Sequence, residues 1–92
     1  MEMLKLIQMH HVYVLKSKNH WRFYVGMTEN IERRLKEHNS GKTKSTKGYK
    51  PWILFSHETF PTRWEARKRE KYLISGIGKE FIKNKWSHSS AG

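Results

Sequence analysis

The chain has 92 residues, a net charge of +11 and no cysteine. A chain of this length accommodates one domain with a single hydrophobic core. The absence of cysteine excludes disulfides, thiolate zinc sites and cysteine nucleophiles, and it fits a reducing, cytoplasmic location. All eight acidic residues are glutamates, so Ser-His-Asp triads and EF-hand loops are excluded as well.

The charge balance points to a polyanionic partner. Nineteen Lys and Arg residues stand against the eight glutamates. On so small a body this excess is most often a sign of nucleic-acid binding, and the alternative is a protein that is merely basic and soluble. Because no stretch has about 20 consecutive apolar residues and residues 1–9 lack the apolar run of a signal peptide, we expect neither membrane insertion nor export.

A β-hairpin is predicted near the start of the chain. Residues 12–15 and 23–25 are β-branched or aromatic runs on either side of a polar stretch. With a turn at residues 18–19, Tyr13 stands directly opposite Tyr24 on one face of the hairpin. Strand alternation then places four apolar side chains on the other face: Val12, Val14, Phe23 and Val25.

The remaining elements follow from capping and turn residues. Thr28 or Asn30 is expected to cap a helix that ends near Gly41, and the lysine-rich stretch 42–50 is expected to form a loop. Residues 52–59 predict a third strand. A capping box at Thr62 and Glu65 predicts a helix to about Ser75, and residues 79–86 predict a short last helix that buries Phe81, Ile82 and Trp86. The pattern indicates a small α+β domain at residues 10–86, between tails at 1–9 and 87–92.

Helical phase places charged residues on two apolar faces. At about 100° per residue, Arg34 and His38 share the core-facing arc of the first helix with Ile31 and Leu35. On the next helix, Glu70 shares a stripe with Ala66, Leu73 and Ile74. Charges directed towards a core are costly unless they are paired, solvated or bound to a metal. Two interpretations remain open: a buried Arg34–Glu70 ion pair, or a carboxylate that holds a metal ion facing phosphate.

The segment from residue 33 to residue 50 is strongly basic. It holds seven Lys or Arg residues and the single acid Glu37, with Tyr49 and Trp52 nearby as faces on which a base could stack. The alternative is a loop without a binding role, because runs of like charge are usually just solvated. The candidate nucleic-acid contacts are Arg33, Lys42, Lys44, Lys47 and Lys50.

Taken in order, these residues resemble the GIY-YIG nucleases. Val12-Tyr13-Val14 stands at the first family motif and Tyr24-Val25-Gly26 at the second. Arg34 follows in Asn-Ile-Glu-Arg-Arg-Leu, and Glu70 falls in Ala-Arg-Lys-Arg-Glu-Lys-Tyr-Leu-Ile. Over residues 10–85 the chain looks closest to small stand-alone bacterial members, which share its Pro51-Trp52 and Phe60-Pro61-Thr62. It departs from the pattern at His11, where the first motif has Gly, and at Met27, where some repair enzymes have Lys.

The resemblance implies a three-stranded antiparallel sheet flanked by helices, in the order β-β-α-β-α-α. It also implies metal-dependent cleavage of phosphodiesters, as in excision-repair incision enzymes. In the family pattern Tyr24 is the general base, Tyr13 positions water and Arg34 stabilises the developing negative charge. Glu70 is the protein ligand of one Mg²⁺ or Mn²⁺ ion, and His38 stands at a position that holds His or Tyr.

Two points stay open at this stage. His38 could accept or relay the proton in place of Tyr24, because a phenol with a pKa of about 10 is a poor base at neutral pH. The whole protein could also be a nucleic-acid-binding module that keeps the fold without catalysis. We expect nucleic acid as the partner, DNA rather than RNA, with a second protein as a means of targeting.

Overall fold

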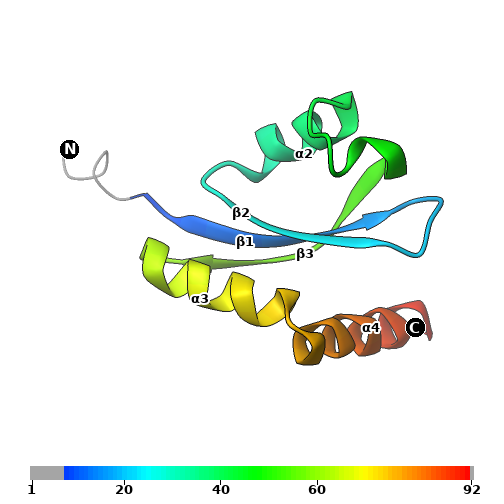
Figure 1. Ribbon diagram of the computed structural model, residues 1–92. Helices are drawn as coiled ribbons and strands as arrows, with labels where there is room; N and C mark the ends of the chain where they lie inside the picture. The colour runs from blue at the N-terminus through cyan, green and yellow to red at the C-terminus, as the bar shows by residue number, and fades with distance from the viewer. Residues whose placement is uncertain (1–7, 92) are drawn as a thin grey trace.

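The centre of the computed structural model, which describes residues 8–91, is a three-stranded antiparallel sheet (Figure 1). The strands are β1 (His10–Ser17), β2 (Phe23–Thr28) and β3 (Trp52–Phe60), in the spatial order β2-β1-β3. Because β1 is paired on both sides, every residue from 12 to 17 is buried. The central strand therefore supplies side chains to two separate cores, one on each face of the sheet.

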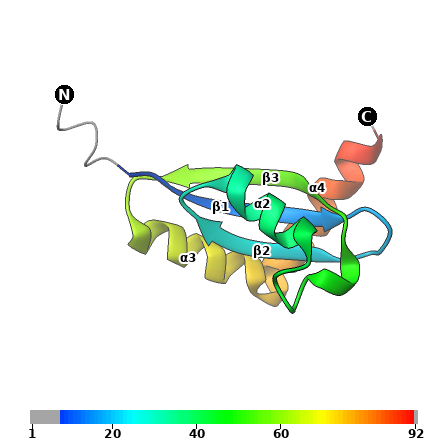
Figure 2. The same cartoon turned by 90° about the horizontal axis from the view of Figure 1, so that it is seen from above.

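Helices cover both faces of this sheet. Helix α2 (Ile31–Ser40) lies on one face, and α3 (Arg63–Ile74) and α4 (Gly76–Ala91) lie on the other (Figures 1 and 2). A short 3₁₀ turn, η1 (Lys47–Tyr49), leads from the basic loop into β3. The predicted α+β class and the order β-β-α-β-α-α are confirmed. Within residues 8–91, no helix is both long enough and apolar enough to span a bilayer.

The two cores divide the apolar residues by strand alternation. Towards α3 and α4 the buried side chains are Val12, Val14, Ala66, Leu73 and Ile82. Towards α2 they are Tyr13, Leu15 and Trp52, with Tyr24, Ile31, Leu35 and Tyr49 packed against them. A bulge in the β1–β3 pairing after Val14 leaves Phe55 as the extra residue of β3. Phe55 packs with the core on the α3 side.

The hairpin pairs two residues away from the predicted register. Tyr13 lies opposite Gly26, and Leu15 lies opposite Tyr24. Since the shift is an even number of residues, every side chain keeps its predicted face, and only the predicted Tyr13–Tyr24 pair is wrong. The connection is longer than a two-residue turn: the Ser17 N–H donates to the carbonyl of Arg22 at 2.9 Å.

A buried lysine explains the longer connection. The ammonium of Lys16 donates to the carbonyls of Ser17 (2.6 Å) and His20 (2.8 Å), which draws the loop around it. The same ammonium lies 5.4 Å from the Trp21 ring centroid and 5.3 Å from that of Trp86. Aromatic faces attract a cation at such distances, so the charge is satisfied although Lys16 is only 6% exposed.

Both predicted helix starts are observed. Asn30, rather than Thr28, caps α2: its side-chain oxygen accepts the Arg33 N–H at 3.0 Å. The helix ends at Gly41, whose φ of 84° lies in the left-handed region that favours glycine. At α3 the capping box is confirmed, because Thr62 accepts the Glu65 N–H and donates its hydroxyl to the Glu65 carboxylate.

The C-terminal part differs from its prediction. Helix α4 begins at Gly76 and reaches Ala91, whereas a helix over 79–86 and a tail over 87–92 were expected. The helix restarts at once because the Ser75 hydroxyl accepts the Gly78 N–H. Ile82 is buried as expected, Trp86 is only partly buried, and Phe81 is 42% exposed with the Arg69 guanidinium 5.4 Å from its ring centroid. Ile74, expected in the α3 stripe, is 49% exposed in an open groove. Residues 1–7 of the expected N-terminal tail, and residue 92, lie outside the described residues.

Gly26 gives a test of the packing between β1 and β2. A Cβ at this position would lie 2.5 Å from the Tyr13 hydroxyl oxygen and 2.6 Å from its Cζ. We expect Gly26→Ala to lower the free energy of unfolding by about 1–3 kcal/mol, because overpacking forces the phenol aside. Urea unfolding followed by fluorescence measures this loss. Gly48→Ala is the matched control, since nothing lies within 4 Å of a Cβ there; equal stability of the two variants would contradict the prediction.

Candidate functional site

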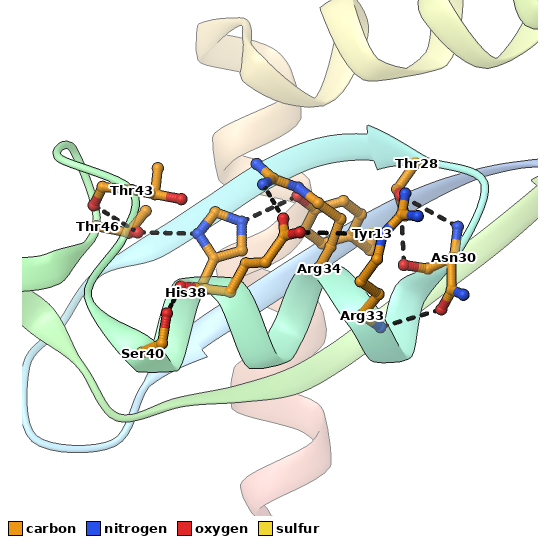
Figure 3. Close-up of polar contacts among 10 residues, drawn as sticks. Tyr13, Thr28, Asn30, Arg33, Arg34, His38, Ser40, Thr43 and Thr46 are labelled. Carbon is orange, nitrogen blue, oxygen red and sulfur yellow. Dashed lines mark hydrogen bonds and ion pairs between the residues drawn. The ribbon is translucent and has the colours of Figure 1, made fainter.

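A buried line of polar side chains connects the sheet, α2 and the basic loop (Figure 3). The Tyr13 hydroxyl lies 3.0 Å from His38 Nε2, and His38 Nδ1 lies 2.9 Å from the Thr46 hydroxyl. The exposed fractions of Tyr13, His38 and Thr46 are 1%, 0% and 1%. Residues 13 and 38, singled out separately in the sequence, are therefore in direct contact away from solvent.

Tyr24 lies beside this pair. Its ring centroid is 4.7 Å from that of His38 and 6.2 Å from that of Tyr13. Unlike its two neighbours, Tyr24 is partly exposed, because β2 is an edge strand of the sheet. The three side chains together form an aromatic cluster, of which Tyr24 is the solvent-facing member.

Arg34 stands at the border of this cluster and pairs with Glu37. Arg34 Nη1 donates to Glu37 Oε1 at 2.6 Å, and the predicted position of Arg34 on the core-facing side of α2 is confirmed. The ion pair raises the pKa of Arg34 and lowers that of Glu37. The buried Arg34–Glu70 ion pair that the sequence left open is not formed, because α2 and α3 lie on opposite faces of the sheet.

The environment keeps both partners of the Tyr13–His38 contact uncharged. Burial raises the pKa of the Tyr13 phenol, an effect that Arg34 opposes and the charges of Tyr24 and Glu70 reinforce. Burial, together with the positive charge of Arg34, lowers the pKa of His38 below 6.5, while Glu37 acts in the opposite direction. At neutral pH the contact is therefore between a phenol and a neutral imidazole.

Glu70 lies on the α3 side, in a separate hollow of about 310 Å³ at the end of β2. Its side chain is 17% exposed, and Arg67 Nε approaches the carboxylate at 3.7 Å. The hollow is lined by His10, Met27, Thr28, Glu29, Arg33, Arg63, Arg67 and Glu70. Within residues 8–91 no hydrogen bond joins Glu70 to the aromatic cluster, but the charge of Glu70 contributes to the raised pKa of the Tyr13 phenol.

The basic loop presents its lysines to solvent. Lys42, Lys44, Lys47 and Lys50 are all exposed, and Lys42 is near enough to Glu37 to help lower the pKa of its carboxyl. Arg33 is also exposed, but it lines the Glu70 hollow instead of the loop.

Trp52 and Tyr49, which were expected to offer stacking faces, are both covered by other parts of the protein. Trp52 is 4% exposed and donates its indole N–H to the Thr46 carbonyl at 2.9 Å, so the expectation is wrong for this residue. Tyr49 is partly buried, and the Arg22 guanidinium covers its ring at 4.5 Å from the centroid.

Four side chains of the site were missed by sequence reasoning: Glu37, Thr46, Arg63 and Arg67. Arg63, Arg67 and Glu70 recur at helical spacing, and this signal could have placed both arginines beside the glutamate. Glu37 precedes His38 on the outer side of α2, and its long side chain turns back to Arg34. For Thr46 no periodicity exists, because it lies in a loop.

The match to a family model assigns the chain to a class. Residues 9–84 match the model of the GIY-YIG catalytic domain, so the chain belongs to that family, and the resemblance in its motifs is confirmed. Membership in this catalytic-domain family points to nuclease-type activity. The matched region contains the aromatic cluster, Arg34 and Glu70.

Individual relatives carry the name UPF0213. One from Clostridium perfringens is 42% identical over 66 residues, which cover 71% of this chain and 70% of the relative. One from Halobacterium salinarum is 41% identical over 72 residues, which cover 77% of this chain and 91% of the relative. The solution NMR structure of a UPF0213 protein from Bacillus halodurans is 35% identical, covers 83% of each chain and has a TM-score of 0.50. The fold is thus shared with a solved relative.

The lowered pKa of His38 predicts a pH dependence of stability. Between pH 6.5 and its lowered pKa, the unfolded chain binds a proton at this histidine while the folded chain does not, so folding is disfavoured as the pH falls through this range. The stability contributed by neutral His38 is complete above 6.5 and is lost as the pH drops through its lowered pKa. Urea unfolding between about pH 7 and pH 5 measures the slope, which we expect to be shallower in His38→Gln. Identical slopes in the two proteins would contradict this.

Proposed function

We propose that the protein is a metal-dependent endonuclease that hydrolyses phosphodiester bonds of nucleic acid, with DNA as its substrate, in repair or recombination. The single observation that carries this proposal is the neutral Tyr13–His38 contact beside the guanidinium of Arg34. Uncharged acid–base groups beside a fixed positive charge are typical of sites that move a proton and stabilise developing negative charge.

Burial favours Tyr24 over His38 as the general base. A general base must come within hydrogen-bond reach of the proton that it removes. His38 is completely buried behind Tyr13, whereas Tyr24 is partly exposed at the edge strand. Tyr24 first releases its own proton to solvent at the exposed edge, and the phenolate then takes the proton from the attacking water. The buried Tyr13–His38 pair packs behind the Tyr24 ring.

Arg34 supplies the charge that stabilises the transition state. Its guanidinium holds the Glu37 carboxylate through Nη1 and also donates to the Tyr13 phenol, and the N–H groups of the fork that are left can donate to phosphate oxygens. Ion pairing raises its pKa, so the side chain stays protonated throughout. Negative charge that develops on the phosphoryl oxygens is therefore met by a cation that needs no reorganisation.

The Glu70 hollow fits one hard divalent cation, Mg²⁺ or Mn²⁺. Among residues 8–91 no group of three or more His or Glu side chains is arranged to hold a metal, so Glu70 would hold the ion together with waters and phosphate oxygens. Magnesium ordinarily keeps several waters in this way and is bound by one or two carboxylates. Such an ion polarises the phosphoryl group and stabilises the leaving oxygen.

A second candidate function is a nucleic-acid-binding module without catalysis. The observation that favours it is the set of three arginines, Arg33, Arg63 and Arg67, around the Glu70 hollow. Guanidinium groups bind phosphate without any metal. The two functions differ in one respect that can be measured, which is whether a bond is broken.

Removal of the Glu70 charge separates them. We expect Glu70→Gln to lower the cleavage rate on the order of 100-fold, because the metal and its electrostatic stabilisation are lost, while DNA binding remains. The assay uses supercoiled plasmid, single strands, branched junctions and RNA with Mg²⁺ or Mn²⁺. Glu80→Gln on the exposed side of α4 is the control. No cleavage by the native protein, with binding intact, would favour the second function.

The basic loop predicts how binding depends on salt. We expect replacement of Lys42, Lys44 and Lys47 by Gln to weaken DNA binding and to reduce the slope of log K against log salt. The reduction should be about 0.9 for each lysine that contacts a phosphate. The control replaces Lys79, Lys83 and Lys85, exposed on α4, by Gln and changes the net charge equally. If both triple variants lose the same slope, total charge and not the loop governs binding.

A further inference from the structure

Thr46 is the one member of the buried polar line that comes from the basic loop. Its hydroxyl lies 2.9 Å from His38 Nδ1 and 3.3 Å from the carbonyl oxygen of Thr43. All buried side-chain nitrogen and oxygen atoms of the described region have a hydrogen-bond partner, so the proton on each bond of this line can be assigned.

The assignment starts from the Tyr13 end. Arg34 lies beside the phenol and can only donate. Within residues 8–91, the acceptor for the Tyr13 proton is therefore His38 Nε2. A neutral imidazole that accepts at Nε2 carries its own proton on Nδ1. That proton is donated to the Thr46 hydroxyl oxygen, whose hydrogen in turn goes to the Thr43 carbonyl. The reverse direction would leave the Tyr13 hydroxyl hydrogen without an acceptor in this line.

Thr46 is held in place by a second set of contacts. Its carbonyl accepts the indole N–H of Trp52 at 2.9 Å, and the backbone of Trp52 is bonded in both directions to the side-chain amide of Asn39. Asn39 directly follows His38 on α2. The loop is thus clamped to the same turn of the helix that carries the imidazole, while Lys44 and Lys47 on either side of Thr46 are exposed.

We propose that Thr46 is a positioning residue, whose hydroxyl holds His38 in the tautomer protonated at Nδ1 and thereby directs Nε2 to the Tyr13 phenol. The two sides of the basic loop then differ in role. The lysines on its outer side face phosphate, and the Thr46 hydroxyl on its inner side fixes the tautomer of His38. The hydrogen-bond assignment stands on the structure alone, and only its effect on cleavage rests on the proposed function.

Imidazole ¹⁵N spectroscopy tests the assignment on the full chain without metal or DNA. A two-bond ¹H–¹⁵N correlation spectrum distinguishes a protonated Nδ1 from a protonated Nε2. We expect a protonated Nδ1 at His38 in the native protein and in Thr46→Ser, which keeps the hydroxyl. Thr46→Val keeps the shape but removes the acceptor, and we expect it to populate the Nε2-protonated tautomer. Thr43→Val is the matched control, because Thr43 contributes only its backbone carbonyl to the line.

Cleavage kinetics supply the second measurement. We expect Thr46→Val to lower kcat about tenfold, the loss of one hydrogen bond to the cluster, with KM unchanged and with rescue by Thr46→Ser. A native His38 protonated at Nε2 would overturn the proposal, and so would a Thr46→Val spectrum identical to the native one. If Thr46→Val does not fold, the native spectrum still decides. A protonated Nδ1 in a protein that cleaves nothing would refute the nuclease and leave the role of Thr46 standing.

Discussion

The close approach of the Tyr13 ring to Gly26 determines how the rest of the site is arranged. An aromatic side chain on the central strand can cross over the edge strand only where its partner lacks a side chain. In this position the phenol reaches His38 on the covering helix. The glycine of the second motif is therefore a steric requirement of the tyrosine of the first motif, and the two motifs form one packing unit.

The sheet also separates the site into two parts. The aromatic cluster and Arg34 lie on the α2 side. Glu70, Arg63 and Arg67 come from α3, and Arg33 of α2 lines the same hollow. Both parts contact the edge strand β2. Its Tyr24 belongs to the aromatic cluster, and its Thr28 lines the Glu70 hollow. An edge strand is narrow, so charges on its two sides lie within range of each other. After burial and the nearer groups, Glu70 also contributes to the raised pKa of the Tyr13 phenol.

Local signals predicted most of the fold. Side-chain alternation placed Tyr13 and Val12 on opposite faces, and caps such as Thr62 and Asn30 fixed where helices begin. The hairpin register escaped prediction because Lys16 organises its loop through backbone carbonyls, which leave no trace in the spacing of apolar residues. The role of Thr46 escaped for a related reason: its partner is eight positions away, and a loop brings the two together. The exposure of Phe81 depends on how α4 packs against its neighbours, and the residue pattern within one helix does not contain this information.

The three arginines around Glu70 would make the proposed binding of a cation and of a phosphate in the hollow interdependent. Three guanidinium groups disfavour a divalent cation that arrives alone, and the carboxylates of Glu29 and Glu70 disfavour a phosphate that arrives alone. When both are present, each cancels the repulsion that the other meets. By linkage, each must then increase the affinity for the other by the same factor. A hollow of this composition favours the ion and the phosphate as a pair.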